Sequence, residues 1–190
     1  MAREIRRRII GTTAVAATAA FACGALLTQT VIVPSWQAMD PAAFLRHFAV
    51  YGPITGATVF PFALAAVPLL AGMTYSTVRN RQPGRIFWAL ATAGMVGTLA
   101  LLPIYFVPAN LAMLDPAFPV QSVHAELIAW YRWNWLRTGL GLASAALATI
   151  AAVRAGRSAG ASSRPSAPGR TPFQYREHRT PHREGHQQEL

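Results

Sequence analysis

The sequence predicts an all-α fold: an integral membrane four-helix bundle with both termini cytoplasmic and a disordered basic C-terminal tail. Of its 190 residues, 53% are hydrophobic and 13% are charged, whereas soluble domains carry about 25% charged residues. The apolar residues gather in four segments, and the arginines gather between and after them. The chain therefore divides into a basic leader at 1–8, a four-span domain at 9–153 and a tail at 154–190.

The first predicted span covers residues 9–33, directly after the leader and its arginine run Arg6–Arg8. About 20 apolar residues cross a bilayer, and this segment is longer than that. A cleaved signal peptide is the alternative, but its apolar region has only about 7–15 residues. The single cysteine, Cys23, lies within the span. One cysteine forms no internal disulfide and makes no metal site alone.

The second predicted span covers residues 54–78 and follows a polar and aromatic loop, Pro34–Gly52. The centre of this loop, residues 41–50, is expected to form a short helix at the membrane interface. Pro61 and Pro68 lie inside the span. Membrane helices tolerate prolines where neighbouring groups satisfy the freed carbonyls, so we expect the span to continue through both.

The third predicted span covers residues 86–107 and is joined to the second by a basic segment, Arg79–Arg85. This segment contains a Pro-Gly dipeptide, which marks tight turns. Pro103 is expected to kink the far end of the span. Residues 108–124 then form a second outer loop before the fourth predicted span, residues 126–153.

The positions of the arginines predict the orientation in the membrane. Positive residues beside membrane spans stay on the cytoplasmic side, and the leader, the basic turn and the tail are all rich in arginine. All 17 basic residues are arginine and alanine is abundant, which is typical of a GC-rich bacterial genome. We therefore expect a multi-pass protein of a bacterial inner membrane. Because the orientation of the spans in the membrane accounts for where the arginines lie, no nucleic-acid partner is expected.

The tail beyond residue 153 is rich in glycine, serine, proline, arginine and histidine. Such a composition cannot bury a core and predicts disorder. Its histidines His178, His182 and His186 recur every fourth residue, but Pro181 and Gly185 interrupt the helix that would align them. No metal site is therefore expected in the tail, because chelation needs preorganised geometry.

The start of the fourth span carries the strongest functional signal. Asn134 and Arg137 are costly to place in lipid, and such residues inside spans mark candidate sites. Arg132 and Trp135 point to other faces and predict an anchor at the interface. At about 100° per residue, one quarter of the helix circumference carries seven residues: Glu126, Trp130, Trp133, Asn134, Arg137, Gly141 and Ser144.

Arg137 lies about 24 Å from Val153 along a helix, roughly one turn below the outer surface of a core of about 30 Å. Two interpretations stay open: an inward polar pocket, or an arginine that snorkels to the interface. The pocket is favoured because lipid would not select the polar face on which Arg137 lies. An inward guanidinium needs acceptors, for which there are four candidates: Glu126, Asp40, Asp115 and the oxygen of Asn110.

A resemblance to a known family rests on this region. The run Trp130-x-x-Trp133-Asn134-x-x-Arg137-Thr138 follows Val107-Pro108-Ala109-Asn110 and Leu114-Asp115-Pro116. Together these motifs resemble the small four-span membrane proteins related to anthrone oxygenases, a family long known as a domain of unknown function. The resemblance covers about residues 9–153 and is specific in the last third. One position departs from the family pattern, because Trp135 stands where relatives often have a histidine.

The resemblance implies an oxygenase that converts an anthrone-type phenolic ketone to a quinone with dioxygen, using neither a metal nor a flavin. An anthrone is acidic at its methylene group, and its enolate reacts with dioxygen directly. The implied partners are therefore an apolar aromatic molecule, dioxygen and membrane lipid, with no cofactor. A homo-oligomer is compatible with this prediction.

The resemblance also implies a role for each site residue. Arg137 stabilises the oxyanion, and Asn134 donates a hydrogen bond to the ketone oxygen. His124 or Glu126 is the candidate base. Three further residues bind the substrate: Trp130 and Trp133, which stack on its rings, and Asn110.

Two alternatives remain beside the oxygenase. In the first, the same pocket belongs to a non-enzymatic membrane protein that binds a small hydrophobic molecule or helps to export it. In the second, outer-loop residues hold a metal, although their positions give no ligand spacing. The residues of this second alternative are His47, His124, Asp40, Asp115 and Glu126.

Overall fold

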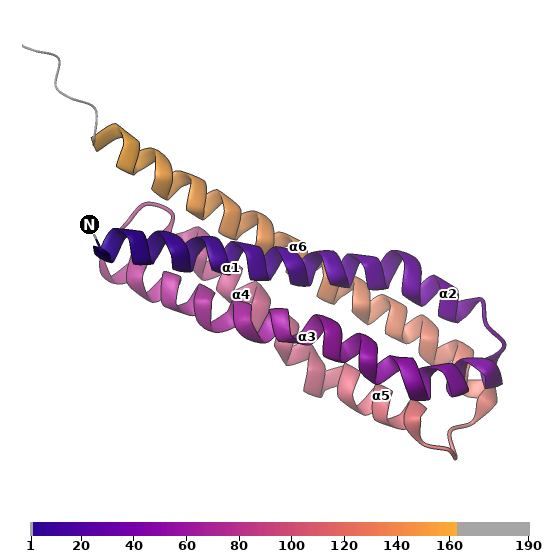
Figure 1. The fold of residues 1–190 in the computed structure, drawn as a ribbon. Coiled ribbons are helices and arrows are strands. Elements are labelled where there is room, and N and C mark those ends of the chain that lie inside the picture. The colour runs from indigo at the N-terminus through magenta and orange to yellow at the C-terminus, as the bar shows by residue number, and fades with distance from the viewer. Residues whose placement is uncertain (1, 163–190) are drawn as a thin grey trace, which may run out of the picture.

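The computed structural model describes residues 2–162, and all regular structure in that range is helical. The elements in chain order are α1 (Ala2–Leu27), η1 (Thr28–Ile32), α2 (Val33–Gln37), α3 (Pro41–Arg79), α4 (Arg85–Leu101), η2 (Leu102–Phe106), α5 (Val107–Leu114), η3 (Val120–Ser122) and α6 (Val123–Ser162). The segments η1 and η2 are π-helical turns, and η3 is a 3-10 turn. Because α1, η1 and α2 are continuous, as are α4, η2 and α5, the chain forms four long helical columns (Figure 1).

The four columns form a closed bundle. Helix α1 packs against α3 and α6, and α4 packs against the same two helices, so α1 and α4 lie at diagonal corners. The N-terminus and the α3–α4 turn lie at one end, which we call the N-terminal end (Figure 1). The α2–α3 and α5–η3 connections lie at the other end, which we call the distal end.

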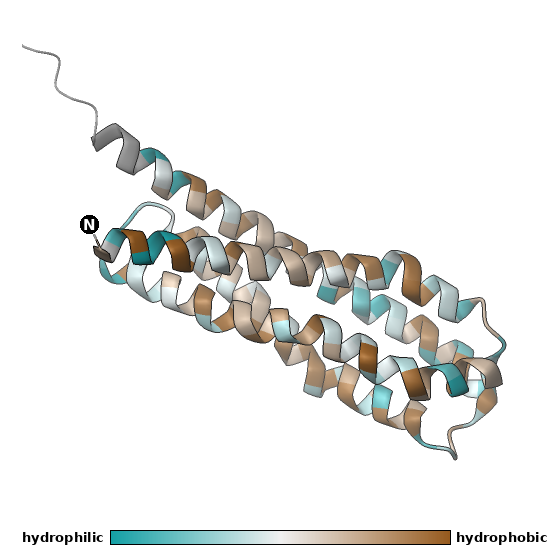
Figure 2. Ribbon diagram, viewed as in Figure 1, coloured by the Kyte–Doolittle hydropathy of each residue, from teal (hydrophilic) through white to brown (hydrophobic). Residues whose placement is uncertain are grey.

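Each column is long and apolar enough to cross a membrane, judged by its length and composition. The four stretches are Glu4–Gln37, Pro41–Arg79, Arg85–Leu114 and Val120–Arg157. Apolar side chains such as Leu64 and Ile104 are exposed on the outside of the bundle, and polar colours gather near its ends (Figure 2). The predicted all-helical fold with four candidate spans is therefore confirmed.

The connection between the first two columns covers only residues 38–40, so the predicted loop Pro34–Gly52 is wrong. Residues 41–50, expected to form a separate interfacial helix, are the first turns of α3. The Asp40 side chain caps this helix by accepting a hydrogen bond from the backbone N–H of Ala43 at 3.0 Å. This cap, followed by a proline in the first turn, starts the helix well before the predicted boundary.

Prolines inside the columns do not end the helices, and those of the first and third columns lie in or near π-helical turns. Helix α3 continues through Pro53, Pro61 and Pro68, as predicted for the last two. Pro34 and Pro108 are each the second residue after a π-helical turn, η1 and η2 respectively, and Pro103 lies within η2. A proline lacks an N–H, and its ring clashes with the carbonyl four residues earlier. For Pro34 and Pro108 that carbonyl belongs to the π-helical turn, whose wider path accommodates the defect.

The turn between α3 and α4 is as tight and basic as predicted. Arg81 and Gly84 both adopt left-handed backbone conformations, with φ of 49° and 86°. A Cβ atom on Gly84 would lie 3.3 Å from the carbonyl oxygen of Ala151 in α6. Glycine therefore suits this position for both its backbone angle and its close approach to α6.

The second distal connection is also shorter than the predicted loop over 108–124. Helix α5 extends to Leu114, so only residues 115–119 separate it from η3. The Asp115 side chain accepts a hydrogen bond from the backbone N–H of Ala117 at 2.8 Å. The prediction was wrong because Pro108 does not end the helix: the carbonyl with which its ring would clash belongs to η2, whose wider turn accommodates it.

Helix α6 extends beyond the predicted end of the fourth span. It runs to Ser162, so residues 154–162 of the predicted disordered tail are helical. Alanine and arginine, which are common in this stretch, favour helix even where the apolar pattern has ended. The rest of the tail, including His178, His182 and His186, lies outside the described residues.

Two clusters of buried residues divide the core along the bundle. The alanine cluster contains Ala14, Ala25, Ala63, Ala66, Ala91, Ala148 and Ala151, packed with Phe21, Leu70, Met73, Trp88 and Met95. The aromatic cluster contains Trp36, Phe44, Phe48, Phe106 and Trp130, packed with aliphatic residues such as Val33 and Leu127. Small residues let helices approach closely, whereas aromatic rings can surround a cation. Arg137 lies among the rings.

Candidate functional site

Helix α6 turns its polar residues toward the inside of the bundle. Asn134, Arg137 and Ser144 are 0%, 5% and 1% exposed. Arg132 and Trp135, which were expected on other faces, are exposed. The periodicity of the sequence therefore predicted the inward face correctly, and Arg137 lies inside the bundle rather than snorkelling to its surface.

Three aromatic rings surround the Arg137 guanidinium. Its Cζ atom lies 4.5 Å from the ring centroid of Phe106, 5.6 Å from that of Trp130 and 5.9 Å from that of Phe60. These rings come from η2, α6 and α3. Each ring face within about 6 Å attracts a cation by roughly 0.5–2 kcal/mol. The rings offset part of the cost of burying the charge, but they supply no negative charge.

Within residues 2–162, no carboxylate forms an ion pair with Arg137. Its Nε is buried and has no hydrogen-bond partner in that range. The four expected acceptors are engaged elsewhere: Glu126 by the Tyr105 hydroxyl (2.7 Å), Asp40 by the α3 cap, Asp115 by Ala117, and Asn110 Oδ1 by the Trp130 indole N–H (3.0 Å). Burying an unpaired charge costs several kcal/mol. Arg137 is thus a buried cation without a counter-ion in the described part of the chain.

A small cavity lies beside the guanidinium. It has a volume of about 40 Å³, and Arg137, Trp130 and Asn110 line it together with Thr28 and Thr55. A water molecule needs roughly 10–15 Å³ of such space. The cavity therefore has room for one small polar group, such as a carboxylate or a carbonyl oxygen, but not for a ring system.

A larger apolar groove adjoins this cavity between α3 and the column of η2 and α5. Its volume is about 360 Å³, which lies within the range of roughly 300–1,000 Å³ found for ligand pockets. The groove and the cavity share five lining residues: Phe48, Gly52, Gly56, Phe60 and Asn110. Pro53, Ala57 and Val107 also line the groove and are exposed, so the groove opens on the outside of the bundle.

A buried pair of amides links α6 to the first column at the same level. Asn134 Nδ2 donates a hydrogen bond to Gln29 Oε1 at 2.5 Å, and both side chains are 0% exposed. Thr138 Oγ1 donates to the carbonyl oxygen of Ala25 at 3.3 Å. The remaining polar atoms of the pair, Asn134 Oδ1 and Gln29 Nε2, have no partner within residues 2–162. This pair is therefore polar and only half satisfied.

The other predicted site residues lie apart from Arg137. Trp133 stacks on Tyr105, with ring centroids 5.1 Å apart and planes inclined by 14°. The Tyr105 hydroxyl donates its hydrogen bond to Glu126, and His124 is exposed. Within the described residues the cavity and groove have no acidic or imidazole side chain among their lining. The structure thus brings together Arg137, Trp130 and Asn110, but it separates them from both candidate bases.

The predicted alternative of a loop metal site finds no geometric basis in the described range. No group of three or more histidine, cysteine, aspartate or glutamate side chains there is placed to hold a metal ion. His47 instead packs against Tyr51, with ring centroids 4.6 Å apart, and Asp40 and Asp115 cap local backbone.

Sequence reasoning missed several residues of the site. Gln29 is the one amide side chain within the first predicted span, and that isolation was a usable signal. Phe60 and Phe106 gave none, because a phenylalanine inside an apolar segment is ordinary. Two of these three residues lie in the π-helical turns: Gln29 in η1 and Phe106 in η2. Such turns occur frequently at functional sites.

The described part of the protein is an all-helical bundle with four helical columns that could span a membrane. Inside it, three aromatic rings surround a buried arginine beside an apolar groove. Comparison of the chain with protein-family models, with curated proteins and with solved structures finds no match. The resemblance to the anthrone oxygenase-like family therefore depends on its motif residues alone and stays a prediction.

Proposed function

We propose that this protein binds a small apolar molecule with an anionic or strongly accepting oxygen, and that Arg137 holds that oxygen. The observation that carries the proposal is the buried guanidinium, which has no counter-ion within residues 2–162. A ligand oxygen in the adjoining cavity would accept a charge-assisted hydrogen bond, which contributes roughly 1.5–3 kcal/mol. The ligand would thereby supply the acceptor that the bundle lacks.

The shape of the site supports an apolar ligand body. The cavity of about 40 Å³ fits only the polar group, whereas the adjoining groove of about 360 Å³ fits rings or a chain. Phe60 and Phe106 line the groove and also face Arg137. A flat ligand would lie against these apolar surfaces and point its oxygen inward. Since the groove opens on the outside of the bundle, the ligand would enter from the membrane.

We further propose that the protein lies in a bacterial inner membrane with its N-terminal end in the cytoplasm, as the positive residues there favour. The site then lies in the outer half of the bilayer. Cysteines introduced singly as Gln82→Cys and Gln121→Cys, in a Cys23→Ser background, test this orientation in intact cells. An impermeant maleimide should label only the Gln121→Cys variant. Labelling of both variants, or of Gln82→Cys alone, would contradict the orientation.

The binding proposal is tested with a dihydroxyanthrone as the probe, using the full chain in lipid nanodiscs. Arg137→Leu removes the buried charge, so the dissociation constant should rise by about tenfold or more, the loss expected for one charge-assisted hydrogen bond. Arg132→Leu is the matched control, because Arg132 is exposed on the same helix. Equilibrium dialysis measures both constants, and equal affinity of the two variants would refute the role of Arg137.

Oxygenation of an anthrone is a second candidate function at the same site. The position of Arg137 among Phe106 and Trp130 favours it, because the guanidinium would stabilise the enolate oxygen. The enolate carbon would bond to dioxygen, and the resulting peroxide anion would take up a proton. Loss of water from the hydroperoxide then forms the second carbonyl. One oxygen atom ends in the quinone and the other in water.

This candidate function needs a source for the enolate. His124 is exposed and Glu126 is bonded to Tyr105, so neither lines the cavity. We propose that the acidic anthrone ionises outside the cavity and that Arg137 selects the anion. Oxygen uptake by anaerobically purified protein, measured with the anthrone, tests this proposal. The parent should consume oxygen faster than the spontaneous reaction does. The Arg137→Leu variant should lose that increase. Uptake at the spontaneous rate in the parent would exclude the oxygenase and leave the binding proposal intact.

A further inference from the structure

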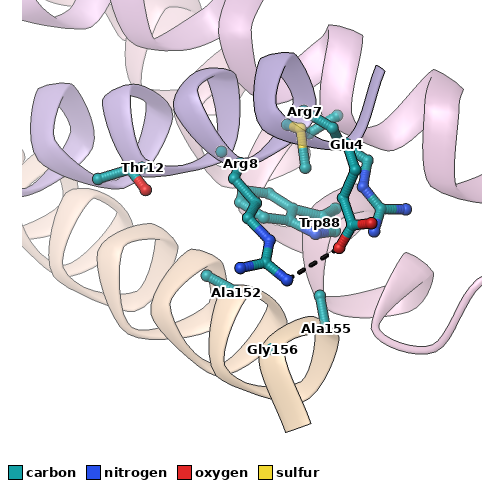
Figure 3. Close-up of a pocket in the computed structure, with 10 residues that line it drawn as sticks. Glu4, Arg7, Arg8, Thr12, Trp88, Ala152, Ala155 and Gly156 are labelled. Carbon is teal, nitrogen blue, oxygen red and sulfur yellow. Dashed lines mark hydrogen bonds and ion pairs between the residues drawn. The ribbon is translucent and has the colours of Figure 1, made fainter. Parts of the chain in front are cut away.

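A second pocket lies at the N-terminal end of the bundle (Figure 3). It has a volume of about 240 Å³, and residues of α1, α4 and α6 line it together with Met73 of α3. It shares no lining residue with the cavity at Arg137. The site proposed for the apolar ligand therefore does not explain this pocket.

Two arginines of α1 line the mouth of the pocket. Arg7 donates a hydrogen bond to Gln82 in the α3–α4 turn, and Arg8 forms an ion pair with Glu4 at 2.8 Å. The side chains of this pair are 65% and 51% exposed, and exposed pairs contribute little because water screens them. The two positive charges of Arg7 and Arg8 thus face the single negative charge of Glu4. An anion that binds Arg8 more tightly than Glu4 does can displace the Glu4 carboxylate.

Trp88 of α4 also lines the pocket and carries a hydrogen-bond donor. Its side chain is 0% exposed, and its indole Nε1 has no hydrogen-bond partner among the side chains and backbone that the structure describes, which exclude the side chains of residues 3 and 158–162. A buried indole N–H normally finds an acceptor, and leaving it without one costs the desolvation of that group. In Figure 3 the ring lies behind the side chains of Arg8 and Glu4. A ligand in the pocket would have both charged donors at its mouth and a neutral donor from Trp88.

Apart from Thr12, the remaining residues that line the pocket are apolar. Ala152 and Ala155 of α6 face α1 across the pocket (Figure 3), and Gly11 of α1 and Met73 of α3 also line it. The pocket also lies where the first candidate span begins, at Glu4. In a membrane this level is that of the lipid head groups, where arginines meet lipid phosphates.

We propose that this pocket binds the phosphate group of an anionic lipid. Arg7 and Arg8 hold the phosphate oxygens, because the guanidinium fork matches phosphate geometry, and the Trp88 indole donates to another oxygen of the lipid. The start of an acyl chain lies against Ala152 and Ala155. A free phosphate ion offers the same oxygens but leaves these apolar walls uncovered, so a lipid fits the whole pocket better.

Native mass spectrometry of the full chain in detergent tests the proposal, with phosphatidylglycerol as the probe. The parent should retain one lipid, and the double variant Arg7→Gln/Arg8→Gln should bind it about tenfold more weakly or worse, as expected for a lost charge-assisted hydrogen bond. The matched control is Arg6→Gln/Arg157→Gln. It removes the same charge from two exposed arginines that do not line the pocket, and its affinity should equal that of the parent.

Two single variants test the Trp88 donor and the apolar wall. Trp88→Phe keeps an aromatic ring but removes the donor, and Ala155→Phe fills the space for the acyl chain. Both should weaken lipid binding. Trp88 is also a fully buried core residue, so Trp88→Phe should lower the melting temperature as well. Ala155→Phe, at a half-buried position, should leave the melting temperature of the lipid-free protein unchanged, and this variant separates the site from the fold.

Inorganic phosphate distinguishes the two sources of the anion. If it displaces the lipid at equal concentration, the site belongs to free phosphate and the lipid assignment is wrong. The assignment is also wrong if the Arg7/Arg8 double variant and its control bind the lipid equally.

Discussion

The alanine cluster and the aromatic cluster give the two ends of one bundle different capacities. In the alanine cluster the helices meet through small side chains such as Ala66 and Ala148, which permit close backbone approach. In the aromatic cluster the contacts are ring to ring, as between Trp36 and Trp130 at 5.6 Å. Aromatic rings can enclose a buried cation, whereas the methyl groups of an alanine seam offer it no ring face. A buried arginine therefore depends on the aromatic end of the bundle.

The two ends should therefore fail under opposite substitutions. The aromatic end should be most sensitive to removal of a side chain, because each ring touches several others. The alanine end should be most sensitive to enlargement at its fully buried alanines, such as Ala66 and Ala148, where a larger side chain would meet the neighbouring helix.

The largest effect is expected for Trp130→Ala in the aromatic cluster. This change opens a cavity and leaves Asn110 without its donor, so the free energy of unfolding should fall by about 3–5 kcal/mol. Reversible unfolding in mixed micelles measures it. Trp135→Ala is the matched control, because Trp135 is 45% exposed on the same helix. Equal losses for the two variants would contradict the ring packing around Trp130.

A smaller loss is expected for Ala148→Leu in the alanine cluster. Ala148 is fully buried, and overpacking such a position destabilises by about 1–3 kcal/mol. The same substitution at Ala146, which is exposed on α6, should leave the free energy of unfolding nearly unchanged. If both variants unfold alike, the seam has spare volume and the contrast between the ends is wrong.

The smallest effect is expected where the two amides of the site are replaced together. Gln29→Leu or Asn134→Leu alone leaves a buried partner unpaired and should cost about 1–3 kcal/mol, whereas the double variant should cost much less than the sum. Unfolding free energies of the four proteins form the double-mutant cycle. Additive losses would show that the hydrogen bond between these amides carries no coupling.

Composition and periodicity were sufficient to predict the helical fold and the inward face of α6. The four apolar segments are separated by clear polar breaks, and burial of Asn134 and Arg137 follows from the spacing of polar residues along one helix. The ends of the helices were not predictable in the same way. Pro34 and Pro108 look like loop residues in the sequence, but each lies in a helix just after a π-helical turn.

The partners of Arg137 could not be predicted because they depend on distances between helices. Glu126 shares the predicted face with Arg137, yet Tyr105 on another column takes its carboxylate. Trp133 lies close to Trp130 in sequence but stacks on Tyr105 instead. Periodicity predicts which side of a helix is buried, but not which neighbouring column each side chain meets.

Protection of the groove by a ligand tests the role of Arg137 most directly. Ala57 lines the groove and is exposed, so an Ala57→Cys thiol, in a Cys23→Ser background, reports whether the groove is occupied. A dihydroxyanthrone should slow maleimide labelling of that thiol when Arg132→Leu is added, and should fail to slow it when Arg137→Leu is added. Equal protection in both backgrounds, or none in either, would contradict an arginine-anchored ligand site.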